Sequence, residues 1–258
     1  MAKIKQLLRK VKRLILKNRI KKHEKLFDRL SYCFFPCEKS KTLIVVFSAF
    51  PGKDCPPVYN YLTTLSGIKA NKLFLLDDVW NLVNVGSYYL GKDGDWYLEQ
   101  DVLDLLQKIK AEHAYDKVIT VGSSKGGTSA LYFGIKTEAD TCIIGAPQYH
   151  VGSYLSSDHS RPILKVIMGD SSQSSIDKLN SYIVEEMRKD HSKKSTIYIH
   201  YSPKEHTYKD HIKDMIADLH ENGYQVIEDN AYDYEQHSDV AKHFPAYLVS
   251  TVKREIQD

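Results

Sequence analysis

The sequence predicts an α/β fold in which a doubly wound, mostly parallel sheet carries helices on both faces. Short, continuous apolar runs alternate along the chain with longer segments whose apolar residues recur at helical spacing. Near the middle, one apolar run ends in a Gly/Ser-rich turn that leads directly into a helix of small residues. In such a sheet ligands bind at the carboxyl ends of the strands, so we expect functional residues in the loops that follow the apolar runs.

The elements follow from these patterns in chain order. Apolar, partly β-branched runs predict strands at residues 43–47, 72–76, 118–121, 141–144, 196–201 and 224–227. Helical periodicity predicts helices at residues 99–112, 125–135, 176–187 and 212–219, and a closing helix from about residue 238. The remaining segments are expected to be irregular: a link at residues 34–40, an aromatic, Gly-rich loop at residues 79–95, and a polar insertion that ends near residue 161.

Length and composition favour a single domain that spans residues 31–258. A chain of 258 residues with 42% apolar residues can bury a full core, and no internal repeat is visible. Its four cysteines lack paired C-x-x-C spacing and are too few for a disulfide framework, which favours a reducing, cytoplasmic location.

Residues 1–30 are predicted to form a basic amphipathic helix. They carry twelve lysines and arginines against Glu24 and Asp28, a net charge of +10, whereas the rest of the chain has −7. The apolar residues that share one helical face are Ile4, Leu7, Leu8, Val11, Leu14 and Ile15. Two interpretations stay open: peripheral attachment to an anionic membrane surface at the inner face of the cell membrane, or docking on the protein's own domain or on a partner.

Other classes of partner and location are disfavoured. No uninterrupted apolar region follows the basic residues, so the segment is not a signal peptide, and no stretch reaches the roughly 20 apolar residues that span a bilayer. Nucleic-acid binding is not expected, because the positive charge is confined to one terminal segment and the body is acidic.

The turn after residues 118–121 matches the pattern G-x-S-x-G through Gly122, Ser124 and Gly126. In a nucleophile elbow, flanking glycines allow a serine to occupy a strained turn with its hydroxyl exposed, so Ser124 is the candidate nucleophile. A phosphate-binding Walker loop is excluded, because the lysine lies inside the turn and Gly127 is followed directly by Thr128. A plain strand-helix turn with closely packed glycines is the structural alternative.

A serine nucleophile needs a base and an acid that orients the base, and in an elbow-bearing sheet both follow the serine in chain order. Glu205 directly follows the strand at residues 196–201, and His237 lies between the last strand and the final helix. Asp210 and Asp229 compete with Glu205 for the role of the acid.

A metal site is not expected. His206 and His211 are both nearby, but the four residues between them do not place both on one helical face, and no third ligand is obvious.

Two loops are expected to form the oxyanion hole. One donor is the backbone N–H of Lys125, directly after the nucleophile, and the other comes from the loop after the first apolar strand, where Ser48 and Ala49 lie.

These residues resemble a known superfamily, the α/β-hydrolases. The FSAFP loop at residues 47–51, the SSKGG elbow at residues 123–127 and a glutamate as the acid more narrowly resemble two bacterial groups. These are accessory secretion proteins implicated in O-acetylation of adhesin glycans, and related hydrolase-like proteins of capsular-polysaccharide biosynthesis. The resemblance covers residues 42–258 and implies that Ser124 accepts the acyl group, His237 is the base and Glu205 orients it.

The resulting expectation is a serine esterase or acyltransferase, with O-acetyl as the expected group, that acts on a bacterial surface polysaccharide or glycan and requires no cofactor. Aromatic residues near the elbow are expected to stack on sugar rings, with Tyr59, Trp80 and Tyr88 as the predicted substrate contacts. The alternative is a non-catalytic, hydrolase-like module that binds a glycan or a polysaccharide-biosynthesis partner. A peptidase or lipase has no specific signal in the sequence.

Overall fold

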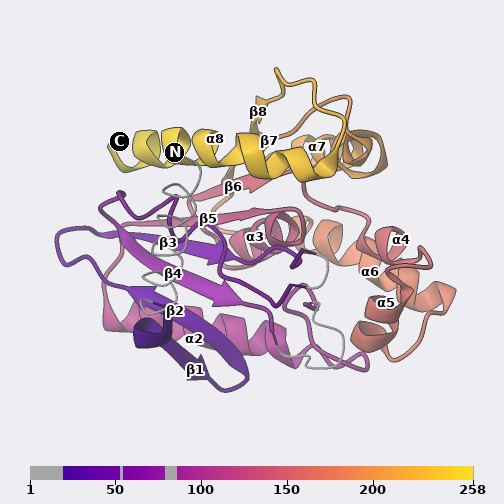
Figure 1. Ribbon diagram of the computed structural model, residues 1–258, viewed down its shortest axis with the longest axis horizontal. Helices are drawn as coiled ribbons and strands as arrows, with labels where there is room; N and C mark the ends of the chain where they lie inside the picture. Colours follow the sequence, from indigo (N-terminus) through magenta and orange to yellow (C-terminus); the bar gives the residue numbers. More distant parts are fainter. Residues whose placement is uncertain (1–19, 53–54, 79–85, 258) are drawn as a thin grey trace, which may run out of the picture.

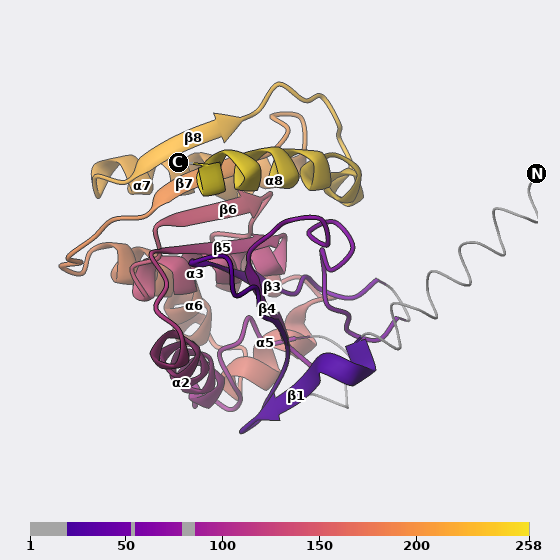
Figure 2. The same ribbon diagram turned by 90° about the vertical axis from the view of Figure 1, so that its left-hand side faces the viewer.

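A single eight-stranded sheet organises the computed structural model, which describes residues 20–52, 55–78 and 86–257. The strand order is β1-β2-β4-β3-β5-β6-β7-β8, and Figure 2 shows this succession from β8 at the top to β1 at the bottom. The strands are β1 (Glu24–Phe27), β2 (Leu30–Phe35), β3 (Thr42–Phe47), β4 (Asn71–Leu76), β5 (Lys117–Ser123), β6 (Thr141–Gly145), β7 (Thr196–His200) and β8 (Gln225–Asp229). Strands β3 to β8 pair in parallel, whereas β1 and β2 are antiparallel to their neighbours.

Helices cover both faces of this sheet (Figure 1). They are α2 (Tyr97–Glu112), α3 (Lys125–Lys136), α4 (Val151–Leu155), α5 (Arg161–Met168), α6 (Gln173–Met187), α7 (Lys213–Glu221) and α8 (Val240–Gln257). Alternate residues of β6 show the two layers: the Cys142 side approaches Gly134 of α3, whereas the Gly145 side packs on Phe244 of α8. The predicted α/β-hydrolase-like fold, with its mostly parallel sheet, is confirmed.

The two strands β3 and β4 at the centre of the sheet are buried along their whole length. Such burial is typical of strands that are covered on both faces, and α3 packs on β3. The continuous apolar runs that predicted these strands are the direct result. All six predicted strands are present, and their ends lie within a few residues of the expected positions.

The prediction for residues 1–30 is wrong in its C-terminal part. Residues 20–23 are helical, but β1 and β2 then form an antiparallel hairpin that extends the sheet. The domain therefore begins before residue 31, and residues 34 and 35 are strand rather than link. The helical spacing of apolar residues ended at Ile15, and only the run of positive charge continued to residue 30, so the extension had no periodic support.

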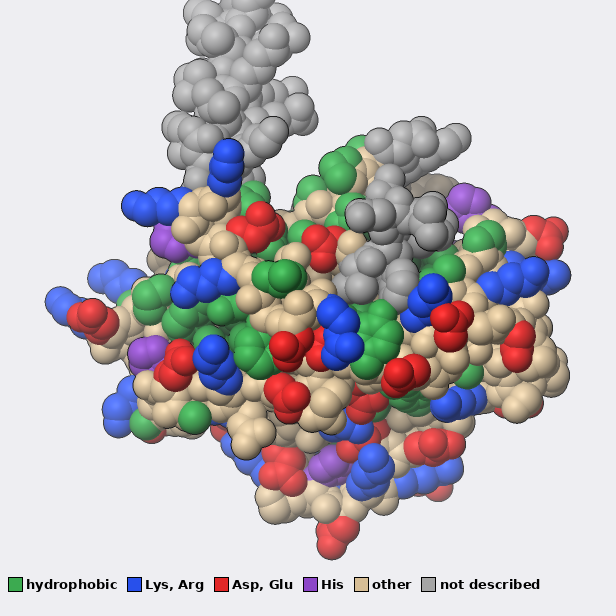
Figure 3. Space-filling view, turned by 90° about the horizontal axis from the view of Figure 1, so that it is seen from below, with side chains coloured by type: hydrophobic (Ala, Val, Ile, Leu, Met, Phe, Trp, Pro, Cys, Tyr) green, Lys and Arg blue, Asp and Glu red, His purple; other side chains and the backbone are tan. Residues whose placement is uncertain are grey.

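The basic segment itself, residues 1–19, lies outside the described residues, and its attachment to an anionic membrane stays a prediction. No helix in the described part of the chain is both long and apolar enough to cross a bilayer. On the face drawn in Figure 3, lysine and arginine side chains are interspersed with aspartate and glutamate, so this face presents no uniformly basic surface.

The polar insertion before residue 161 also differs from the expectation. It contains the short helix α4, and α5 follows it directly. Helix α4 packs against α6, and a methyl group on Gly152 would come within 2.0 Å of the backbone oxygen of Ile176. Five residues are too few for helical periodicity to be recognised in a sequence.

The close packing of β5 against α3 gives a test of the fold. A Cβ atom at Gly122 would lie 2.0 Å from the backbone oxygen of Gly126, a contact that no side-chain movement relieves. We expect Gly122→Ala to lower the free energy of unfolding by about 1–3 kcal/mol, measured by urea denaturation.

The matched control is Gly67→Ala, because a Cβ at Gly67 meets no atom within 4 Å. It is expected to change stability by at most about 0.5 kcal/mol. Equal stability of the two variants would contradict the close approach.

Candidate active site

Ser124 lies at the sharp turn between β5 and α3, with φ 52° and ψ −130°. This left-handed conformation is unfavourable for a residue with a side chain, so the surroundings must hold it in place. The N–H of Ser124 donates to the backbone oxygen of Gly145 at 2.8 Å. On the other side of the turn, a Cβ on Gly126 would come within 2.5 Å of the backbone oxygen of Phe47. The absence of a side chain at Gly126 therefore lets the turn pack closely against the end of β3, while the backbone of Ser124 is hydrogen-bonded to the end of β6.

His237 approaches this serine from the far end of the chain. It begins a short 3-10 turn, His237–Asp239, in the connection between β8 and α8. Its Nε2 lies 2.8 Å from Ser124 Oγ, within hydrogen-bond reach.

Glu205 lies behind the imidazole, in the loop after β7. Its Oε1 is 3.3 Å from His237 Nδ1, which is an ion-pair distance but not the geometry of a formed hydrogen bond. Nδ1 is buried and has no other polar partner among the described residues, so Glu205 is the group that it faces. Catalytic hydrogen bonds are often long before a substrate is bound.

The surroundings of Glu205 stabilise the ionised form of its carboxyl group. Its side chain is fully buried, and it accepts hydrogen bonds from the backbone N–H of Thr207 at 3.2 Å and from the Thr207 hydroxyl. His206 Nδ1 lies 2.9 Å from the same Oε1. Burial alone would raise the pKa of Glu205, but the interactions with His237 and Thr207 outweigh it and hold the pKa below its usual value.

The two competing acids lie elsewhere. Asp229 ends β8 and pairs with the buried His200 through a contact of 2.6 Å to Nδ1. Asp210 lies in the π-helical turn Tyr208–Ile212 and lines a different pocket. Of the three carboxylates, the structure places Glu205 against His237.

Gln148, which the sequence did not single out, also contacts the serine. Its Nε2 donates to Ser124 Oγ at 2.8 Å, and its side chain is fully buried. Thr128 fixes its backbone through two hydrogen bonds, donating to the carbonyl at 2.8 Å and accepting from the N–H at 2.9 Å. Because an amide N–H only donates, Ser124 Oγ must accept here, which directs its own proton toward His237. A glutamine that follows a strand has no motif of its own, so only the spatial neighbourhood of β5 and β6 reveals it.

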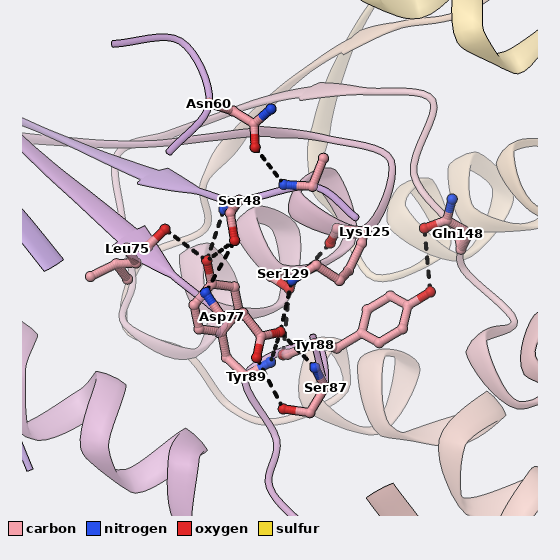
Figure 4. A network of polar contacts seen from close by, with 11 residues as sticks. Ser48, Asn60, Leu75, Asp77, Ser87, Tyr88, Tyr89, Lys125, Ser129 and Gln148 are labelled. Carbon is pink, nitrogen blue, oxygen red and sulfur yellow. Dashed lines mark hydrogen bonds and ion pairs between the residues drawn. The ribbon is translucent and has the colours of Figure 1, made fainter. Parts of the chain in front are cut away.

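The prediction that Ser48 and Ala49 supply the oxyanion hole is wrong for the structure as it stands. The Ser48 N–H donates to the Tyr89 hydroxyl at 2.8 Å, and the Ala49 N–H donates to Asn60 Oδ1 at 2.8 Å. Figure 4 shows Ser48 together with the Tyr89 and Asn60 side chains that accept these two hydrogen bonds. These amides are satisfied by side chains that arrive from later segments. The N–H of Lys125, at the first position of α3, has no such partner among the described residues, and it lies where a helix N-terminus favours negative charge.

The Lys125 side chain points into the protein and forms a buried ion pair with Asp77. Nζ lies 2.7 Å from Asp77 Oδ2, and both side chains are at most 1% exposed. Burial lowers the pKa of Lys125, and the attraction of Asp77 opposes that change. Asp77 also accepts from the N–H groups of Ser87 and Tyr89, and its own N–H donates to Ser48 Oγ (Figure 4). The pair thus ties the elbow to the ends of β3 and β4.

A cleft of about 470 Å³ opens above Ser124. Its lining includes Phe50, Tyr61, Tyr154 and His237. Of the predicted sugar contacts, Tyr59 and Tyr88 are wrong: both are buried and neither lines the cleft, since Tyr59 donates to Glu24 and Tyr88 packs on Phe50. The third, Trp80, lies outside the described residues. Among those residues, no group of three or more His, Cys, Asp or Glu side chains is arranged to hold a metal ion.

A sequence model of one protein family, described as the accessory Sec system GspB-transporter, matches residues 14–254. The chain belongs to this family. The resemblance to accessory secretion proteins is confirmed by this match. Among the curated proteins, no sequence matches the chain.

Several solved structures of other proteins share the fold of this chain. The capsule O-acetyltransferase of Neisseria meningitidis serogroup A superposes with a TM-score of 0.75 at 22% identity, covering 91% of this chain and 94% of the other. The Glycosylation Associate Protein complex of Streptococcus agalactiae gives a TM-score of 0.73 at 21% identity, with 89% of this chain matched to 44% of the other. The fluorophosphonate-binding serine hydrolase FphF of Staphylococcus aureus gives 0.54 at 15% identity, covering 88% and 90%. At these identities the likeness shows the fold.

The buried ion pair gives a second test. Lys125→Met removes the positive charge and leaves Asp77 buried without it, which typically costs about 3–5 kcal/mol. We expect a loss of this size in the free energy of unfolding, measured by urea denaturation.

Lys41→Met is the matched control, because Lys41 pairs with Asp116 at 3.5 Å and both side chains are 69% exposed. Its loss should stay below about 1 kcal/mol. A similarly small loss for Lys125→Met would refute the anchoring role of the pair.

Proposed function

We propose that this protein is a serine-dependent acyltransferase or esterase that moves an O-acetyl group on a bacterial surface polysaccharide or glycan. The observation that carries the proposal is the spatial order Ser124, His237, Glu205, in which Oγ lies within hydrogen-bond distance of Nε2, at 2.8 Å, and Nδ1 lies 3.3 Å from the carboxylate. A non-catalytic module has no need for this order, which argues against the alternative.

In the first half of the proposed reaction, His237 Nε2 takes the proton of Ser124 as Oγ bonds to the acyl carbonyl carbon. The Lys125 N–H, at the positive end of α3, is positioned to stabilise the oxyanion. As the tetrahedral intermediate collapses, His237 returns the proton to the leaving group, and the acyl-serine remains. Glu205 stabilises the imidazolium and keeps the Nδ1 proton toward itself.

In the second half, His237 takes a proton from the acceptor hydroxyl, which attacks the acyl-serine carbonyl. The intermediate then expels Ser124 Oγ, which regains its proton from His237. A sugar hydroxyl as acceptor gives transfer, and water gives hydrolysis.

The proteins with similar structures support the choice of acetyl as the transferred group and of an acyl-CoA as its donor. One relative is a capsule O-acetyltransferase, and a variant of that enzyme was solved in complex with CoA. We therefore include an acyl-CoA thioester as the donor. The likeness to the fluorophosphonate-binding hydrolase supports the use of a fluorophosphonate as a probe.

The direct test of the nucleophile is intact-mass analysis after incubation with p-nitrophenyl acetate or a fluorophosphonate. We expect one adduct on the parent and none on Ser124→Ala, because Ser124 is the hydroxyl that His237 contacts. Ser123→Ala is the matched control, since the neighbouring Ser123 contacts Tyr61 instead and should leave labelling intact. An equal adduct on the parent and Ser124→Ala would sink the assignment.

Gln148→Glu tests the direction of the proton. The substitution keeps the shape but turns a donor into an acceptor that competes with His237 for the Ser124 proton. We expect acyl-enzyme formation at pH 8 to slow by about 10²-fold or more, as when an oxyanion donor is lost. The defect should narrow toward lower pH, because the protonated carboxyl donates again.

Gln100→Glu is the control for this change, because Gln100 is exposed and donates a hydrogen bond to Asp104 on its own helix. It should leave the pH-rate profile unmoved. A Gln148→Glu profile parallel to that of the parent would show that Gln148 does not set the proton direction.

Glu205→Gln tests whether Glu205 is ionised in the folded protein, through the pH dependence of the free energy of unfolding. Because the folded-state pKa of Glu205 lies below its ordinary value, the carboxylate stabilises the fold above the unfolded-state pKa of about 4.3. That contribution disappears as the pH falls through the folded-state pKa. We expect Glu205→Gln to be less stable than the parent at neutral pH, with a difference that shrinks at acid pH in urea denaturation. A pH-independent difference would contradict an ionised Glu205.

A further inference from the structure

A further pocket opens beside the cleft of Ser124. It has a volume of about 480 Å³ and is lined by six residues: His150, Ser153, Tyr154, Ser157, Asp210 and His211. Tyr154 lines both the pocket and the cleft, so the two hollows share a wall. A molecule bound in the pocket therefore lies next to the site where Ser124 reacts.

Two segments build this pocket. One is residues 150–157, which include α4, and the other is the π-helical turn Tyr208–Ile212. The backbone N–H of His150 donates to His211 Nδ1 at 3.2 Å, which joins the segments. The ring of Tyr154 lies edge-on to the ring of His211, with 5.9 Å between centroids.

The shared contact fixes the chemistry of His211. Since Nδ1 accepts a hydrogen bond, the proton of the neutral ring is on Nε2. Burial and the neighbouring His150 lower the pKa of His211 to about 4, so the ring is neutral at pH 7. His211 therefore offers the pocket an uncharged N–H donor.

The other lining groups complement this donor. Asp210 adds carboxylate oxygens that only accept, and Ser157 is exposed and adds a hydroxyl. Tyr154 also lines the pocket, and its hydroxyl is a group that can both donate and accept a hydrogen bond. No lysine or arginine is among the six lining residues, which disfavours a phosphate or carboxylate ligand. A sugar hydroxyl both donates and accepts, and it matches this set.

We propose that this pocket binds a neutral sugar unit of the acceptor glycan, adjacent to the unit whose hydroxyl receives the acyl group from Ser124. The assignment rests on the proposed function, because it presumes a glycan acceptor. Tyr154 separates the two units and contacts both, so it aligns the chain of the acceptor across the two hollows.

Binding of neutral trisaccharides tests the pocket without any reaction. Maltotriose and chitotriose are titrated by calorimetry into Ser124→Ala, with and without Ser157→Trp, whose indole fills the pocket. We expect at least one trisaccharide to bind, and its affinity to fall by about tenfold or more with Ser157→Trp. Ser174→Trp, at an exposed position of α6 away from the pocket, should retain the affinity.

Three results would overturn the assignment: no binding of either trisaccharide, binding that Ser157→Trp leaves unchanged, or binding of coenzyme A that Ser157→Trp abolishes. The last result would show that the pocket binds the anionic acyl donor instead of a neutral sugar.

The p-nitrophenol burst with p-nitrophenyl acetate separates this proposal from the proposed function. Ser157→Trp should leave the burst of the otherwise unchanged enzyme intact while transfer to the trisaccharide falls by about tenfold. Absence of a burst from the parent would refute the serine mechanism, and the titrations would still decide what the pocket binds.

Discussion

The strained turn at Ser124 is the constraint on which the site depends. A residue with a side chain is held at φ 52° because the backbone on either side approaches its neighbours more closely than any Cβ allows. Gly122 and Gly126 make this approach possible, and the turn in consequence presents Oγ above the sheet at the N-terminus of α3. The loops that follow β6, β7 and β8 lie at the same edge of the sheet as Ser124. Gln148 and His237 therefore contact Ser124 Oγ, and Glu205 contacts His237.

Behind the turn, the buried pair of Lys125 and Asp77 supplies the rigidity that a strained turn requires. It joins the first turn of α3 to the ends of β3 and β4 and to residues 87 and 89. Tyr89 completes the connection, because its hydroxyl accepts the N–H of Ser48 and donates to the backbone oxygen of Leu75. Charges buried this deeply are stable only when fully paired, so the network has little freedom to rearrange.

Some residues of the site could be predicted from the sequence, and others could not. Ser124, His237 and Glu205 were predictable because an elbow fixes chain order and strand ends, and the structure brings all three together. The prediction that Ser48 and Ala49 form the oxyanion hole was wrong because their N–H groups donate to Tyr89 and Asn60, partners that no local sequence pattern reveals. Gln148 was missed for the same reason, since its role comes from the pairing of β5 with β6. The β1–β2 hairpin was misassigned because a run of positive charge carries no information on backbone period.

The most direct measurement of the central claim is a crystal structure of the protein with a phosphonate bonded covalently to Ser124. The account predicts the phosphonyl oxygen within about 3 Å of the Lys125 N–H, with His237 Nε2 beside the leaving-group position and Nδ1 facing Glu205. A phosphonate on another residue would contradict the account, as would a His237 displaced beyond the reach of one water molecule from Ser124.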